Sequence, residues 1–328
     1  YKESVTFEDY GEAGRQCWLF GIPLFGRKLD AEAMTWHLGS GLPVKRLDIA
    51  ETLRAELDGI FADTPVKTVG GKRHVFVFWA NSGEIALLLM FFWQRILERT
   101  DIQAPSEVVV LCTKNYHKEM LRFYFPEIRA VVAKPKILRY VLGDMTAGDW
   151  QVHMCFPGKY FAQFEASASE CPVNYVDWMS KWFELSLTEP QKPDPEELET
   201  ARASALSKLS PLQRRALHEG RLVVLALDSF SSAPLGDEAK QGIKKELLNQ
   251  NLVLYNNTSD PSERHFMTYP ELFAISKAAC KIVSLRSGLV DFLSNTGAPI
   301  TTYYTSFPDR GFNTPSKRSD QVFTLFSM

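Results

Sequence analysis

The chain has 328 residues, of which 45% are hydrophobic and 23% carry a charge, proportions ordinary for a globular protein of about two domains. Its formal net charge is −2, so no overall field draws it to nucleic acid or to an acidic membrane. The longest apolar block, IALLLMFFW at residues 85–93, is too short to cross a bilayer and predicts a buried helix without a transmembrane segment.

The cysteines and histidines point away from disulfides and from a metal site. The five cysteines include no C-x-x-C pair, and the six histidines include no H-x-x-x-H pair. We therefore expect reduced thiols, no metal and no other cofactor. No signal-peptide pattern is visible, so we predict a cytoplasmic protein, or one peripheral at the inner face of the membrane. The chain begins at Tyr1, and further domains beyond it stay an open alternative.

The first half of the chain becomes regular only after an irregular start. Residues 1–70 are predicted to form an N-terminal extension or a small accessory layer, with helical patterns at 31–39 and 49–61. Apolar, β-rich runs then alternate with helical patterns. Strands are expected at 74–80, 107–113 and 127–132, with helices between them. Such alternation predicts parallel strands joined by right-handed crossovers, and hence a Rossmann-like domain over residues 71–190.

A change of composition separates this domain from the next. Residues 191–220 are rich in Pro, Glu, Lys and Ala, and they predict a helical connector between domains. Asp194 and Ser210 each precede a proline and have the spacing of capping boxes, so each is expected to begin a helix. Gly220 is placed to end the second helix.

The α/β alternation returns in residues 221–328. Strands are expected at 221–228, 251–258, 280–285 and 299–305, with helices between them. The fold class is therefore α/β, with two Rossmann-like domains facing each other across a cleft. In such sheets ligands bind beyond the carboxyl ends of the strands.

Two loops at predicted strand ends contain groups suited to binding or catalysis. Asn81, Ser82 and Gly83 follow the first strand, and the glycine would let the backbone approach a ligand closely. Glu84 then falls in the first helical turn, where it could also do no more than favour the helix dipole. The loop after residue 228 is rich in hydroxyls, which suit either phosphate binding or a plain turn. These hydroxyls belong to Ser229, Ser231 and Ser232.

Two further segments belong to the second domain. The long loop and capped helix at 255–272 predict either a functional segment or a solvated surface loop. The stretch SLRSGLVDFL breaks from strand to helix at Arg286, Ser287 and Gly288, a weak signal for an anion site. Neither G-x-G-x-x-G nor a P-loop motif occurs.

Three stretches together resemble the heptosyltransferase-like glycosyltransferases, carbohydrate-active family 9. They are FVFWANSGEIALLLMFFWQRILER, YVDWMSKWFELSLTEP and YPELFAISKAACKIVSLRSGLVDFLSNTGAPITTYYT. The order of elements matches over roughly residues 72–305. The resemblance implies the two-domain GT-B fold, a nucleotide-sugar donor, a saccharide or lipid-linked saccharide acceptor, and a pathway of bacterial cell-surface polysaccharide or lipopolysaccharide assembly.

The chain departs from this family at several positions. Glu84 stands where the family has aspartate, and Arg286 stands in the donor corner where the family has aspartate. Asp291 lies where the family has histidine, and the first loop of the second domain lacks the family's lysine. The resemblance therefore implies a glycosyltransferase related in plan to this family and not a heptosyltransferase.

Within that fold the resemblance gives the candidate residues roles. Glu84 would be the general base of an inverting, metal-independent transfer. Acceptor-side candidates are Asn81, Ser82, Gly83, His117 and His153. Donor-side candidates are Arg286, Ser287, Gly288, Asp291, Ser229, Ser231, Ser232, Tyr255, Thr268 and Glu271. A nucleotide-sugar 2-epimerase of the same fold and a non-catalytic nucleotide- or sugar-binding module stay open as alternatives.

Overall fold

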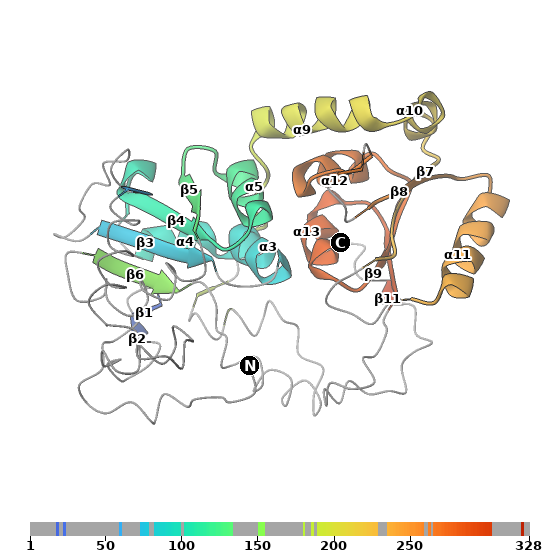
Figure 1. Ribbon diagram of the computed structural model, residues 1–328. Coiled ribbons are helices and arrows are strands. Elements are labelled where there is room, and N and C mark those ends of the chain that lie inside the picture. The colour runs from blue at the N-terminus through green and yellow to red at the C-terminus, as the bar shows by residue number, and fades with distance from the viewer. Residues whose placement is uncertain are drawn as a thin grey trace, which may run out of the picture. The chain divides into compact units, whose positions relative to one another are not determined.

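The computed structural model describes residues 18–19, 22–23, 59–60, 73–78, 82–99, 102–133, 150–154, 180, 185–186, 189–228, 235–258, 262–263, 265–303 and 323–324 (Figure 1). The chain divides into two compact units. One contains Tyr1–Ala80, Phe92–Gly158 and Ser180–Ser186, and the other contains Asn81–Phe91, Lys159–Met179 and Leu187–Met328. In the described part of the chain, no helix has the length and apolar character needed to span a membrane.

The first unit is built on a six-stranded sheet in the order β2-β1-β6-β3-β4-β5. Strands β3, β4, β5 and β6 pair in parallel, whereas β1 and β2 form an antiparallel pair that joins the sheet edge through β6. Part of the predicted N-terminal extension therefore belongs to this sheet. The strands are β1 (Trp18–Leu19), β2 (Ile22–Pro23), β3 (Arg73–Phe78), β4 (Val108–Cys112), β5 (Arg129–Val132) and β6 (Trp150–Met154).

The central strands of this sheet are buried on both faces, as expected of parallel strands covered by helices. Every residue of β4 is buried, and its sequence VVVLC shows no polar alternation. The helical segments of the unit are α4 (Trp93–Arg99), the 3₁₀ turn η2 (Pro105–Glu107) and α5 (Asn115–Tyr124). Helix α5 buries Met120, Leu121 and Tyr124 at helical spacing and ends before Pro126.

The second unit contains a five-stranded sheet in the order β11-β10-β9-β7-β8, in which only the short β11 runs antiparallel. Helix α11 lies on one side of the sheet, and α12 and α13 lie on the other (Figure 1). The strands are β7 (Leu222–Ala226), β8 (Val253–Asn256), β9 (Lys281–Leu285), β10 (Ile300–Tyr303) and β11 (Phe323–Thr324). The helices are α11 (Asp237–Asn249), α12 (Tyr269–Ser276), α13 (Gly288–Leu293) and the 3₁₀ turn η5 (Ser294–Thr296).

Residues 191–220, predicted to be a connector, contain two capped helices, α9 (Pro195–Lys208) and α10 (Pro211–His218), and they group with the second unit. The Asp194 carboxylate accepts hydrogen bonds from two backbone N–H groups of α9, and Ser210 forms the predicted capping box of α10. Gly220 adopts φ of +65° just beyond α10, a conformation that favours glycine at a helix end. The two mainly parallel sheets and the helices between their strands confirm the prediction of a Rossmann-like α/β fold.

One helix lies elsewhere than its sequence neighbours suggest. Helix α3 (Ser82–Phe91) follows β3 of the first sheet but groups with the second unit, where it packs against α13. The residues Ile85–Met90 are all buried. A helix that is apolar on every side gives no directional pattern, so its sequence does not say which neighbour it contacts.

Candidate functional site

The second sheet has a topological switch point between β7 and β9. From β7 the chain crosses to β8 on one side, and from β9 it crosses to β10 on the other. The connections that leave these two adjacent strands therefore diverge at their carboxyl ends, which is where ligands bind in open α/β sheets. The register pairs Ala226 with Ser284, and the Ser284 hydroxyl donates to the Ala226 carbonyl at 3.1 Å. This edge of the sheet is the candidate donor site.

Arg286 stands one residue beyond β9 at this edge. Its backbone N–H donates to the Tyr303 carbonyl of β10 at 2.8 Å, which fixes its place in the sheet. Its guanidinium donates to the Ser287 carbonyl and to Oδ2 of Asp291, both at 2.9 Å. The side chain keeps 37% of its surface exposed, whereas that of Asp291 keeps 19%. Arg286 is therefore held at the corner and still reaches solvent.

Burial raises the pKa of Asp291, and the neighbouring Arg286 opposes that rise. The ion pair thus supports the charged form of a carboxylate that its surroundings disfavour. Asp291 is therefore a largely buried partner of Arg286, and its contact with a donor stays a prediction.

The two predicted glycine corners meet in one place. A methyl group added to Gly83 would lie 3.0 Å from the Gly288 Cα atom and would overlap Oδ2 of Asp291. A methyl group added to Gly288 would overlap the Ser82 hydroxyl and the Gly83 amide nitrogen. The first turns of α3 and α13 are therefore in direct contact, and Glu84, half-buried, is the next residue of α3. The structure brings together Ser82, Gly83, Gly288 and Asp291, which the sequence assigned to opposite substrates.

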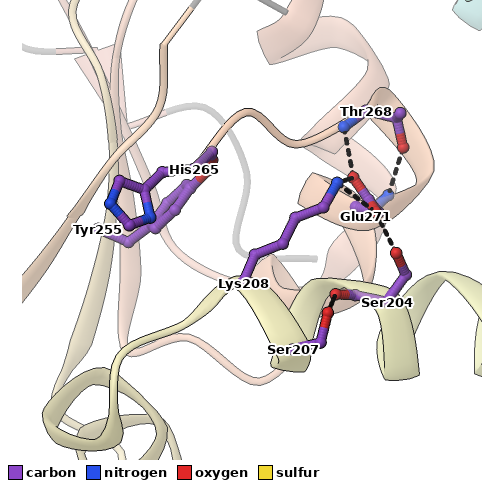
Figure 2. A network of polar contacts seen from close by, with 7 residues as sticks. All are labelled: Ser204, Ser207, Lys208, Tyr255, His265, Thr268 and Glu271. Carbon is purple, nitrogen blue, oxygen red and sulfur yellow. Dashed lines mark hydrogen bonds and ion pairs between the residues drawn. The ribbon is translucent and has the colours of Figure 1, made fainter. Parts of the chain in front are cut away.

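A second polar cluster joins α12 to the connector (Figure 2). Glu271 is buried, with 5% of its surface exposed. Its carboxylate accepts hydrogen bonds from Lys208 Nζ at 2.6 and 2.7 Å and from the Ser204 hydroxyl at 2.5 Å. It also accepts from the Thr268 backbone N–H at 2.7 Å, closing the capping box predicted for α12. Burial alone would raise the pKa of Glu271, but the bonds from Lys208 and Ser204 outweigh it and the pKa is lowered. Glu271 is thus an anion enclosed by donors.

Tyr255 lies near this cluster in strand β8. It is buried, and its hydroxyl donates to the His265 carbonyl at 2.5 Å, which ties the loop before α12 to the sheet (Figure 2). Burial, together with the charge of Glu271, raises the Tyr255 pKa. These contacts give Tyr255, Thr268 and Glu271 structural partners, and their contact with a base or ribose stays a prediction.

The two candidate histidines lie in the core of the first unit. His153 of β6 is fully buried, hydrogen-bonds His74 of β3 at 2.9 Å and stacks on Phe76 with ring centroids 4.4 Å apart. Burial, with the neighbouring His74, lowers the pKa of His153 to about 3. His117 of α5 is fully buried as well and contacts the Thr113 hydroxyl at 3.4 Å. Their role toward an acceptor stays a prediction.

Four candidate residues lie outside the described residues: Asn81, Ser229, Ser231 and Ser232. The structure adds Lys240 of α11, which the sequence reading did not single out. Its Nζ lies 2.7 Å from Oδ1 of Asp228, just beyond β7. The sequence did contain a signal for Lys240. It is a cation close to two acidic residues at the start of a helix, where the dipole favours anions. Among the described residues, no group of three or more His, Cys, Asp or Glu could hold a metal ion.

Comparison with known proteins gives similarity in structure. No family model matches the sequence, and no curated protein matches it. The glycosyl transferase family 9 structure from Veillonella parvula DSM 2008 is similar at 12% identity with a TM-score of 0.45, over 76% of this chain and 85% of that one.

A dodecameric iron-containing heptosyltransferase, TibC, solved in complex with ADP-D-beta-D-heptose, is similar at 12% identity with a TM-score of 0.42, over 71% of this chain and 59% of that one. Both descriptions name the class that the sequence motifs resemble.

Proposed function

We propose that the chain is a glycosyltransferase that binds a nucleotide-sugar donor at the carboxyl edge of its second sheet and moves the sugar to a hydroxyl of a saccharide acceptor. The observation that carries this proposal is the position of Arg286. It places a solvent-reaching guanidinium one residue beyond β9, at the switch point of a parallel sheet. The sequence resemblance to family 9 gives the reaction class.

The donor diphosphate would be bound by Arg286. A guanidinium presents several N–H donors in a plane and matches phosphate oxygens in a two-pronged arrangement. Without donor, that group is occupied by the Ser287 carbonyl and by Asp291. A diphosphate would compete with these acceptors for the guanidinium N–H groups. Hydrogen bonds to its charged oxygens would be stronger than the bond to the neutral Ser287 carbonyl.

Glu84 would act as the general base. It directly follows Gly83, whose neighbour Gly288 belongs to the donor corner. The Glu84 carboxylate would take the proton of the acceptor hydroxyl while its oxygen attacks the anomeric carbon, and the bond from that carbon to the phosphate oxygen would break. Arg286 would stabilise the negative charge that develops on the departing nucleoside diphosphate. A base that activates the acceptor on the side opposite the leaving group would give inversion at the anomeric carbon.

The finer features follow from the resemblance and belong to the same proposal. The enzyme would work without a metal, in agreement with the lack of a D-x-D motif in the sequence. Its acceptor would be a saccharide or a lipid-linked saccharide in bacterial cell-surface polysaccharide or lipopolysaccharide assembly.

Two measurements test the function. Wild type should bind at least one of ADP, GDP, UDP, CDP and dTDP, seen as a rise in melting temperature that depends on nucleotide concentration. It should also release nucleoside diphosphate from the matching nucleotide-sugar, and Glu84→Gln should lower that rate by about a hundredfold or more while leaving binding intact. Binding by none of the five nucleotides would refute the proposal. Unchanged turnover in Glu84→Gln would remove the base assignment alone.

A further inference from the structure

We infer that Lys240 is a second phosphate-binding cation of the donor site. In the absence of donor it forms an ion pair with Asp228. The inference rests on the proposed function and adds to it a residue from α11. It starts from the two strands that form the switch point, because each is followed by a charged residue just beyond its carboxyl end.

These residues follow two strands that pair with each other in parallel. The last paired residues are Ala226 and Ser284. Asp228 follows two positions after Ala226 and Arg286 two positions after Ser284, so both residues lie just beyond the carboxyl ends of adjacent strands. Lys240 Nζ is 2.7 Å from Oδ1 of Asp228. Both cations therefore stand at the carboxyl edge of the two central strands.

They reach this edge from opposite sides of the sheet. Lys240 comes from α11, which covers one side, and Arg286 leads into α13, which lies on the other (Figure 1). A group bound over the edge between β7 and β9 would have one cation on each side. A diphosphate suits this arrangement, because its two phosphates carry separate charges that one guanidinium cannot fully match.

A purely structural role explains Lys240 less well. It is the fourth residue of α11, where the helix dipole disfavours a cation. Its partner Asp228 keeps 59% of its side chain exposed, and an ion pair this open to water adds little to stability. Lys240 itself keeps 21% exposed, so its ammonium is held in a defined place and stays accessible.

Lys240 and Asp228 have different roles in this proposal. Lys240 supplies charge to the phosphates, whereas Asp228 orients the ammonium in the absence of donor. On donor binding the ammonium exchanges a carboxylate oxygen for a phosphate oxygen, and no covalent bond changes. Loss of the lysine should therefore cost affinity, and loss of the aspartate should not.

The test uses the full chain and whichever of ADP, GDP, UDP, CDP and dTDP binds wild type most tightly. Calorimetry should show that Lys240→Gln weakens binding by about tenfold to a hundredfold, the effect of losing one charged hydrogen bond. Asp228→Asn should bind as wild type or more tightly. Lys245→Gln, which removes the same charge from an exposed position of the same helix, should bind as wild type. Melting temperatures report whether each variant is folded.

The possible results separate the inference from the function. If Lys240→Gln binds as wild type while Arg286→Ala binds weakly, the inference is overturned and the proposed function stands. If Lys240→Gln and Asp228→Asn lose affinity equally, Lys240 acts only as the partner of Asp228 and the inference is again overturned. If wild type binds none of the five nucleotides, both fall.

Discussion

Gly83 and Gly288 lie against each other where the first turns of α3 and α13 meet, and neither position has room for a side chain. Each glycine follows a serine that begins or precedes its helix, so the two corners have the same local sequence, Ser-Gly. The contact explains why both corners lack a Cβ atom without any appeal to a ligand. It also places Glu84 and Arg286 on segments that are packed against each other.

Replacing Gly83 by alanine should destabilise the protein. The added methyl group would overlap Oδ2 of Asp291 and crowd Gly288, and overpacking of this kind costs about 1–3 kcal/mol. Urea unfolding should show this loss. Gly242→Ala is the matched control, because that glycine lies within α11 with no atom within 4 Å of the added methyl group. It should gain about 0.5–1 kcal/mol. Equal effects at the two positions would contradict the close contact.

Arg286→Ala should weaken nucleoside diphosphate binding by more than about tenfold, because a charged hydrogen-bond donor is lost. Arg286→Lys should recover part of the affinity, since it keeps the charge but not the planar set of donors. Calorimetry measures both. Arg286→Ala also leaves the largely buried Asp291 without its charged partner, so melting temperatures are needed beside the affinities. Wild-type affinity in folded Arg286→Ala would rule out the phosphate role.

The Glu271 cluster predicts a stability that depends on acid pH. Its folded-state pKa lies below the ordinary value of 4.5, so its contribution is fully present above that value and is lost as the pH falls through the folded-state pKa. Glu271→Gln should be less stable than wild type by about 1–3 kcal/mol at pH 7. The gap measured by urea unfolding should narrow as the pH drops below 4.5. A gap that is independent of pH would mean that the charge of Glu271 does not contribute.

Lys208→Met tests the same cluster from the connector. It keeps an apolar chain of similar length but removes the donor at 2.6 Å from the Glu271 carboxylate. The variant should lose stability at neutral pH, and the loss should shrink as the pH falls below 4.5, because Lys208 contributes the largest of the interactions that lower the Glu271 pKa. Lys277→Met, at an exposed position just after α12, is the control and should leave the unfolding curve near that of wild type.

His153 predicts a second, independent effect of pH. Its folded-state pKa is about 3, against an ordinary value of 6.5. Between these two pH values His153 is protonated in the unfolded chain but neutral in the folded chain. Stability should therefore be complete above pH 6.5 and fall by up to about 1.4 kcal/mol for each pH unit below it. In His153→Gln this slope should be smaller between pH 6.5 and 5. An identical slope would show that His153 is not the group responsible.

The elements could be predicted because their signals are local. Capping residues such as Ser210 and Thr268 announce helix starts within four residues of sequence, and the apolar run of β4 can only be a buried strand or helix segment. The contacts of the site could not be predicted in this way, because they join residues that are distant in the sequence. The Lys208–Glu271 pair spans 63 positions, and the Gly83–Gly288 contact spans far more. A sequence pattern indicates which face of a helix or strand is buried. It does not indicate which other element packs against that face.

The position of α3 bears on how the protein can be divided. A fragment of residues 187–328 would retain the whole second sheet but lose the apolar helix that packs on α13. The complementary fragment would carry the buried residues Ile85–Met90 without that partner. A cut at the connector, the obvious choice from the sequence, therefore leaves each half with an uncovered apolar surface. Neither half is therefore expected to be stable when it is produced alone.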